Sequence, residues 1–256
     1  MKATLTYHSV DDSRSPVSVS PAAFDAHIAW LASGQVTVLS LDALIRHPDN
    51  GGDAVAITFD DGFLNTREPM LRLREYGLPV TVFVVTDHVG RTNAWGGQAD
   101  ASVPTLPLLS WDDLADLQAQ GVEIAAHTRS HAALSTLPTS AIDQELATCR
   151  EELATRLGAR SGHLAYPYGD VDPRVASRAS VQFRYGHTTE FRGMRHRDHP
   201  LRLPRLDMYY LRSSGALDRW GTLTGRLTRE WVGARRLIRH GLLGGPFPGM
   251  PRRWTR

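Results

Sequence analysis

Two clusters of carboxylate and imidazole side chains in this sequence have the composition of a metal-dependent hydrolytic site. Asp60 and Asp61 follow the apolar run 55–59, and adjacent carboxylates are costly to place together unless a cation or distinct roles separate them. His127 and His131 are four residues apart, which predicts both imidazoles on one face of a helical turn. Two imidazoles and one carboxylate leave open positions on a metal, as catalytic sites require. One aspartate would then ligate the metal while the other accepts a proton from the attacking water.

Other polar residues also follow the predicted strands, at the point where each strand ends. His8 follows a strand predicted over 3–7, and Tyr168 follows a weaker strand predicted over 163–166. In a parallel (β/α) barrel all strands end on one face, where the connecting loops build the active site. We therefore expect His8 and Tyr168 to lie at the same mouth as the two clusters.

The elements that position these residues alternate along the chain. Strands are predicted over 3–7, 35–39, 55–59, 80–85, 122–126, 163–166 and 181–187. Helices are predicted after Ser20, over 40–45 and 66–76, from Ser110 to Gly121, and from a Ser140 cap to Leu157. This alternation indicates βαβ units and a parallel sheet. Seven or eight such units favour a barrel over an open doubly wound sheet.

The composition is that of a globular protein and argues against several other classes. Of 256 residues, 41% are hydrophobic and the net charge is +2, too small to indicate a nucleic-acid partner. No apolar run approaches the roughly 18 residues of a membrane span, and the N-terminus lacks the apolar stretch of a signal peptide. We therefore expect a cytoplasmic protein. Cys149 is the only cysteine, and its helical context predicts a buried, inert thiol.

The last part of the chain, residues 221–256, differs from the barrel predicted over 1–220. Its arginines are interleaved with Leu, Trp and Ile, which predicts a basic amphipathic helix as a C-terminal extension. One interpretation packs this helix on the barrel with its arginines in solvent. The other places it peripherally against an anionic membrane surface or a partner.

The chain resembles the polysaccharide deacetylase family, the NodB-homology carbohydrate esterases, over residues 5–207. Residues 58–62 match the family's T-F-D-D-G motif, and residues 127–131 match its H-[S/T]-x-x-H motif. Residues 165–169 match its third motif in the Y-P-Y-G form. The first two motifs, in this order and at this separation, are a specific signal.

The resemblance implies a distorted (β/α) barrel that holds a divalent metal, commonly zinc. It implies that Asp61, His127 and His131 are the metal ligands and that Asp60 is the general base. It implies that a backbone N–H near Tyr168 stabilises the tetrahedral oxyanion. The implied reaction hydrolyses an N-acetyl group on an amino sugar to an amine and acetate. The expected cytoplasmic location points to a glycan or glycoconjugate precursor, and a basic tail would suit an anionic lipid carrier at the inner membrane face.

Two departures from the family pattern leave roles to be filled. Many members begin the third motif with an arginine that orients the base; Ala165 stands there, and Arg205 is a candidate replacement by position. The family's late L-x-H motif, whose histidine is the general acid, is absent after Asp207. His8 and His187 are the candidate acids, with His8 slightly favoured.

Other functions fit parts of the same sequence. The barrel could hydrolyse an O-acetyl ester or a cyclic amide, since fold and metal do not fix the substrate. A non-catalytic sugar-binding relic and a peripheral membrane scaffold are further alternatives.

Residues 87–107 predict a long loop that walls a substrate groove. Trp95 and Trp111 flank it and are candidates for stacking on a sugar, although a core role suits Trp111 equally well.

Overall fold

A parallel sheet forms the centre of the computed structural model, which describes residues 1–95, 102–213, 215–222, 225 and 232–233. Its order is β10-β1-β5-β6-β7-β8-β9, and β4 pairs with the beginning of β5. The strands of this sheet are β1 (Lys2–Tyr7), β4 (Thr37–Val38), β5 (Ala54–Phe59), β6 (Val80–Val84), β7 (Glu123–Ala126), β8 (His163–Ala165), β9 (Tyr185–His187) and β10 (Arg205–Asp207). A separate small sheet joins β2 (Ser9–Val10) to β3 (Ser18–Val19).

The two edges of the sheet come together and nearly close a barrel. His187 at the end of β9 forms a parallel bridge with Leu203, just before β10. The Thr188 N–H donates to the Leu203 carbonyl and the Leu203 N–H donates to the Gly186 carbonyl, both at 2.8 Å. The predicted distorted (β/α) barrel is therefore confirmed.

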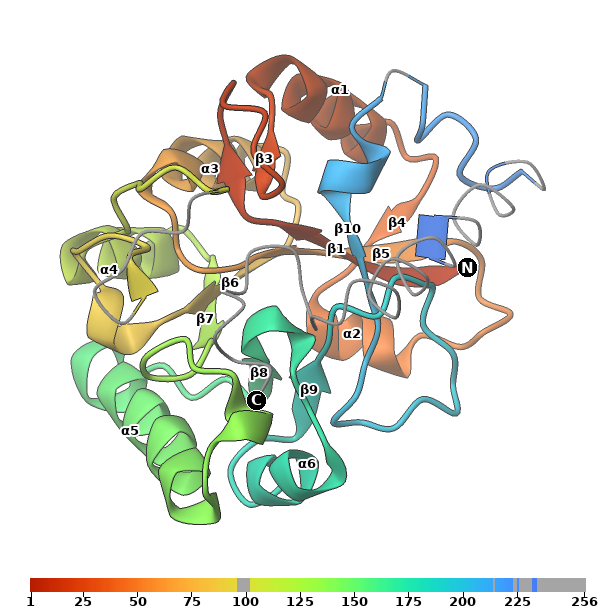
Figure 1. Ribbon diagram of the computed structural model, residues 1–256. Helices are drawn as coiled ribbons and strands as arrows, with labels where there is room; N and C mark the ends of the chain where they lie inside the picture. Colours follow the sequence, from red (N-terminus) through yellow and green to blue (C-terminus); the bar gives the residue numbers. More distant parts are fainter. Residues whose placement is uncertain (96–101, 214, 223–224, 226–231, 234–256) are drawn as a thin grey trace.

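Helices surround the strands on the outside of this barrel (Figure 1). They are α1 (Pro21–Ala32), α2 (Leu41–Arg46), α3 (Arg67–Glu75), α4 (Trp111–Ala119), α5 (Thr139–Leu157) and α6 (Pro173–Ala179). Ser110 begins α4 with a capping box to Asp113, as its sequence predicted. The predicted Ser140 cap of α5 is wrong, because Pro138 is the N-cap and its carbonyl accepts from the Ile142 N–H. The strands predicted over 35–39 and 181–187 are also shorter than expected.

The strands contribute side chains to two apolar clusters, one on each face of the sheet. The larger one lies under the helices, and the smaller one contains the alternate residues of the same strands. The smaller cluster includes Ala54, Ala56, Ala125 and Ala165, which leave room for the larger ring of Phe83. Because side chains alternate along a strand and both faces are covered, nearly every strand residue is buried.

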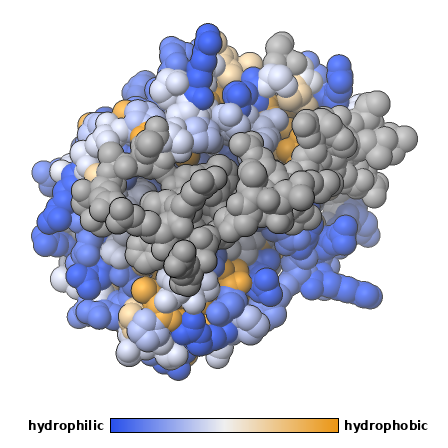
Figure 2. All heavy atoms as spheres, viewed as in Figure 1, coloured by the Kyte–Doolittle hydropathy of each residue, from blue (hydrophilic) through white to orange (hydrophobic). Residues whose placement is uncertain are grey.

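The described surface is largely hydrophilic on the face shown in Figure 2, with hydrophobic side chains scattered over it. In the part of the chain that the structure describes, no helix has the length and apolar character needed to cross a bilayer. The basic tail predicted over 221–256 falls almost entirely outside the described residues. Its helix, its membrane contact and the predicted cytoplasmic location stay predictions.

Candidate active site

Three potential metal ligands meet at the carboxyl ends of two strands. Asp61 follows β5, and His127 and His131 follow β7. Oδ1 of Asp61 lies 3.2 Å from Nε2 of His127 and 3.2 Å from Nε2 of His131. All three residues are buried, and their ligand atoms lie within 4.8 Å of one another. Within the described residues, this is the one group of three such side chains close enough to hold a metal.

The hydrogen bonding around the three side chains, and not only their residue types, fits a bound cation. Oδ1 of Asp61 is buried without a hydrogen-bond partner among the described residues. Nδ1 of His127 lies 2.7 Å from the Ala165 carbonyl, which fixes the proton on Nδ1 and leaves the Nε2 lone pair facing Asp61. A buried carboxylate oxygen between imidazoles is costly unless a positive charge joins them.

The expected helical turn between the two histidines is wrong. Residues 127–132 form no helix: the chain bends at Arg129 and Ser130, and Thr128 and His131 both adopt positive φ, at 64° and 63°. Thr128 is buried, and its Oγ1 accepts from the His131 N–H at 3.2 Å. Two left-handed residues turn the chain back sharply, which brings both imidazoles to Asp61 without a helix.

Backbone strain is concentrated around this site. Five described residues other than glycine have positive φ, and four of them are Asp61, Thr128, His131 and Tyr168. Each costs about 1–3 kcal/mol and persists only where the surrounding structure determines it. The fold therefore holds these four residues against their local preference.

Glu145 on α5 is a positioning residue that the sequence patterns did not reveal. Its Oε2 accepts from the backbone N–H groups of Arg129 (3.1 Å) and Ser130 (2.9 Å), and its Oε1 accepts from the Ser130 hydroxyl at 2.7 Å. Glu145 is almost fully buried. A buried glutamate on an otherwise apolar helix face is the signal that could have identified it, because such a carboxylate requires partners.

Asp60, the predicted base, is held by a buried arginine. Arg205 donates from its two terminal nitrogens to Oδ1 and Oδ2 of Asp60, each at 2.7 Å, and from Nε to the Thr188 carbonyl at 2.9 Å. Burial opposes ionisation of Asp60, but the charge and hydrogen bonds of Arg205 outweigh it and lower its pKa. Asp60 is therefore an ionised carboxylate that retains lone pairs for a further donor.

Arg205 reaches Asp60 from the strand β10 through the interior of the barrel. It lies on β10 beside Thr4 of β1, and its guanidinium lies over the Phe83 ring, 5.7 Å from the centroid. Ala165 is buried in the same interior cluster as Phe83. The candidate replacement inferred from position alone thus contacts the residue it was expected to orient.

The structure places the two candidate acids differently. Nε2 of His8 lies 3.8 Å from Oδ2 of Asp60, and its side chain is 19% exposed. His187 is fully buried, with its Nε2 3.0 Å from Nδ1 of His163 and its ring against Phe83. Burial lowers the pKa of His187 well below its ordinary value. Only His8 therefore combines contact with Asp60 and access to solvent.

Tyr168 and Trp95 border the triad. The Tyr168 ring meets the His131 ring edge to face at 4.7 Å, and its φ of 60° turns the backbone sharply at the third motif. Trp95 stacks on His131 itself, with ring centroids 4.3 Å apart.

Trp111 packs against the core under the Arg156 guanidinium, as its alternative core role predicted.

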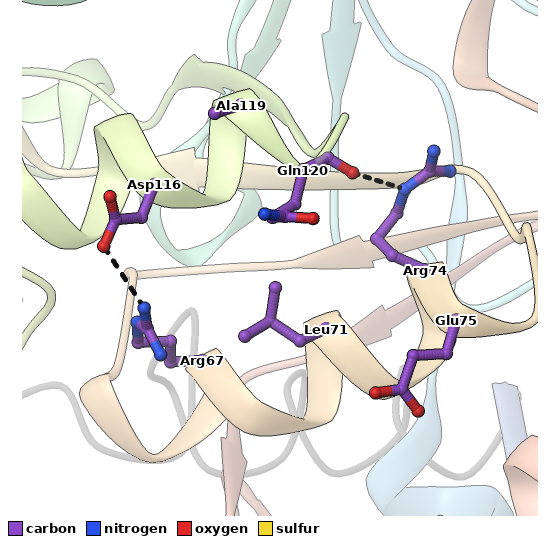
Figure 3. A pocket seen from close by; sticks show the side chains of 7 residues that line it. All are labelled: Arg67, Leu71, Arg74, Glu75, Asp116, Ala119 and Gln120. Atoms are coloured by element: carbon purple, nitrogen blue, oxygen red, sulfur yellow. Dashed lines mark hydrogen bonds and ion pairs between the residues drawn. The ribbon is translucent and has the colours of Figure 1, made fainter.

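Two surface hollows differ in their relation to this site. One, of about 540 Å³, lies between α3 and α4, where Arg67 reaches Asp116 and Arg74 donates to the Gln120 carbonyl (Figure 3). The other, of about 870 Å³, is lined by Asp11, Arg14 and other residues that follow β1 and β10. The second hollow therefore lies beside segments that follow the carboxyl ends of β1 and β10, whereas the triad follows β5 and β7.

We expect Glu145→Ala to lower the free energy of unfolding by about 2 kcal/mol, because two half-buried backbone N–H groups lose their acceptor. Zinc affinity should fall as well, since the loop that carries His131 loosens. Urea denaturation and competition with a chromogenic chelator measure the two effects. Glu151→Ala, an exposed position on the same helix, is the control. Equal behaviour of the two variants would contradict the role of Glu145.

Arg205→Met should destabilise the protein by about 3–5 kcal/mol and abolish activity, because it leaves the Asp60 charge buried and unpaired. Arg205→Lys keeps the charge but not the paired hydrogen bonds, and we expect an intermediate loss. The matched control is Arg178→Met, which breaks a half-exposed pair with Asp143. That change should destabilise the protein far less, because water screens this half-exposed pair. Calorimetry that finds similar losses for both methionine variants would refute this assignment.

Comparison with known proteins places this site in a family. Residues 47–186, more than half of the chain, match the sequence model described as polysaccharide deacetylase. YxkH of Bacillus subtilis is 24% identical over 192 residues, which cover 73% of this chain and 63% of that protein. The poly-beta-1,6-N-acetyl-D-glucosamine N-deacetylase of Staphylococcus epidermidis is 25% identical over 232 residues, 84% of this chain and 73% of that one.

Solved structures share the fold at low sequence identity. IcaB from Ammonifex degensii has a TM-score of 0.69 at 22% identity, over 91% of this chain and 97% of that chain. The deacetylase PplD of Streptococcus pyogenes has a TM-score of 0.66 at 19% identity, over 80% of this chain and 91% of that chain. These likenesses support the barrel alone. Because the family's sequence model matches more than half of the residues, and all three predicted motifs lie within the match, this chain belongs to the polysaccharide deacetylase family of enzymes.

Proposed function

We propose that this protein is a divalent-metal-dependent N-deacetylase that acts on a polysaccharide of N-acetylglucosamine. Asp61, His127 and His131 are the metal ligands, and zinc suits their mixed nitrogen and oxygen donors. The observation that carries the proposal is the buried Oδ1 of Asp61, which lies 3.2 Å from both imidazole nitrogens and lacks a hydrogen-bond partner among the described residues.

The residues around the triad supply the proton transfers of amide hydrolysis. A bound divalent cation would polarise the acetyl carbonyl and acidify water at the site. Asp60 accepts the proton of the attacking water, since it is ionised and Arg205 holds it in one orientation. A carbon–oxygen bond to the acetyl carbon forms first, and the bond from that carbon to the sugar nitrogen breaks afterwards.

Two further groups complete the reaction. A backbone N–H of the strained turn at Tyr168 donates to the oxyanion that develops on the acetyl oxygen. His8 donates a proton to the leaving nitrogen, so that the products are acetate and a sugar amine. The contact between His8 and Asp60 supports this division of roles, because a proton taken up by Asp60 lies next to the group that must deliver one.

The substrate class rests on the relatives. The Staphylococcus epidermidis protein is named for its action on poly-beta-1,6-N-acetyl-D-glucosamine, and the alignment covers 73% of its length. We infer that a β-linked N-acetylglucosamine polymer is the substrate to test first.

Wild-type protein should bind one zinc ion and release acetate from poly-β-1,6-N-acetylglucosamine. Asp61→Ala should lose both properties, because it removes a ligand. Asp60→Asn should keep zinc and lose about 10²–10⁴-fold in kcat, because it removes the proton acceptor alone. Metal analysis of dialysed protein and an enzymatic acetate assay measure the two quantities.

Parallel assays on an O-acetylated polysaccharide and on a cyclic amide separate the alternative reactions. Faster turnover of the O-acetylated substrate would replace the N-deacetylase by an esterase. A wild-type protein that binds no zinc after zinc is supplied would contradict the proposed site.

His8→Ala should retain zinc and lose about 10²–10⁴-fold in kcat on the acetamido sugar, whose amine leaving group needs a proton. The loss should be much smaller on p-nitrophenyl acetate, because nitrophenolate leaves without one. Steady-state assays of both substrates with the wild type and the variant make the comparison. Equal losses on the two substrates would remove His8 from the role of general acid.

A further inference from the structure

The two imidazoles of the triad are supported in different ways. A metal-ligating imidazole usually donates its second ring N–H to an acceptor that fixes the orientation of the ring. Nδ1 of His127 has such an acceptor in the Ala165 carbonyl, at 2.7 Å. Nδ1 of His131 is buried and has no hydrogen-bond partner among the described residues. Among the described residues, ring contacts rather than a hydrogen bond to Nδ1 therefore orient the His131 ring.

Aromatic rings surround His131 instead. The Trp95 indole stacks on it with ring centroids 4.3 Å apart and an interplanar angle of 24°. Tyr168 and His127 meet it nearly perpendicularly, at 4.7 Å and 69° and at 5.1 Å and 72°. Of these three contacts, the stack with Trp95 covers a face of the imidazole. It thereby restricts rotation of the ring out of its plane.

The loop that carries Trp95 is itself fixed. Asn93 is buried, and its side chain donates to the Pro104 carbonyl at 3.1 Å and accepts from the Leu106 N–H at 2.7 Å. The backbone N–H of Trp95 donates to the Asn93 carbonyl at 3.0 Å. The His88 ring meets the Trp95 indole edge to face, with ring centroids 4.8 Å apart and an interplanar angle of 76°. The indole is thus held from its backbone and from a second aromatic neighbour.

We propose that Trp95 is the positioning residue for the metal ligand His131, taking by stacking the place that a hydrogen-bond acceptor takes for His127. The inference rests on the proposed function, because it assigns His131 to the metal. It also changes the expected role of Trp95, whose stacking partner is a protein imidazole. The side chain acts through His131 on metal affinity and geometry.

Zinc affinity tests this assignment without any deacetylase assay. Trp95→Ala should weaken zinc binding by about tenfold or more, the effect of losing the partner that orients a ligand. Trp95→Phe keeps a flat ring and should recover most of the affinity. The visible absorption spectrum of the cobalt-loaded protein should change for Trp95→Ala and stay close to wild type for Trp95→Phe, because it reports ligand geometry. Thermal melting of each zinc-free variant checks that it is folded.

Tryptophan fluorescence gives a second readout that a purely structural role would not move. Zinc places charge beside the imidazole on which Trp95 stacks, so the wild type should show a zinc-dependent change in emission. That change should disappear in Trp95→Phe. It should persist in the matched control Trp111→Phe, because the Trp111 indole on α4 lies under Arg156 of α5.

The outcomes separate this inference from the proposed reaction. Wild-type zinc affinity and an unchanged cobalt spectrum in folded Trp95→Ala would overturn the role of Trp95. A zinc-dependent emission change that survives in Trp95→Phe would also overturn it. A wild-type protein that binds zinc but releases no acetate would refute the deacetylase, while the affinity comparison would still decide the role of Trp95. Failure of the wild type to bind zinc would end both proposals.

Discussion

Two adjacent carboxylates buried at the end of β5 are the constraint on which the rest of the site depends. Asp60 and Asp61 cannot both be ionised in a buried place unless each has its own positive partner. Arg205 supplies a fixed charge to Asp60 through two 2.7 Å hydrogen bonds. Asp61 faces His127 and His131, and a cation fits between them. Because the two carboxylates have different partners, they can have different roles: Asp61 can ligate a metal while Asp60 accepts a proton.

The barrel meets this constraint with small interior residues and strained turns. Alanines inside the strands leave room for the Arg205 guanidinium over Phe83, so that a β10 side chain reaches Asp60. Left-handed residues at the strand ends direct Asp61 and His131 toward each other. Glu145 supports one of these turns from a helix behind it. Local preference is thus overcome by packing and hydrogen bonds from elsewhere in the chain.

Aromatic contacts add a second layer of support around the ligands. Trp95 and Tyr168 come from loops after different strands, and both rings contact His131. The loop predicted to wall a substrate groove therefore contributes directly to the proposed metal site through Trp95. A ligand whose orientation depends on a loop rather than on a strand is more easily altered by substitution there.

The sequence alone determined the family, the barrel and the residue types of the site. Apolar runs alternating with helical patterns indicate a parallel sheet, and its strand ends gather Asp60, Asp61 and His127. Their motifs are local, so they are visible without the fold. The tertiary structure alone decided how His131 turns back to Asp61, because Glu145 on α5 holds the backbone between the two left-handed residues through contacts that no spacing rule records. It also decided the pairing of Asp60 with Arg205, 145 residues apart, since that contact exists only once the sheet brings β10 beside β1.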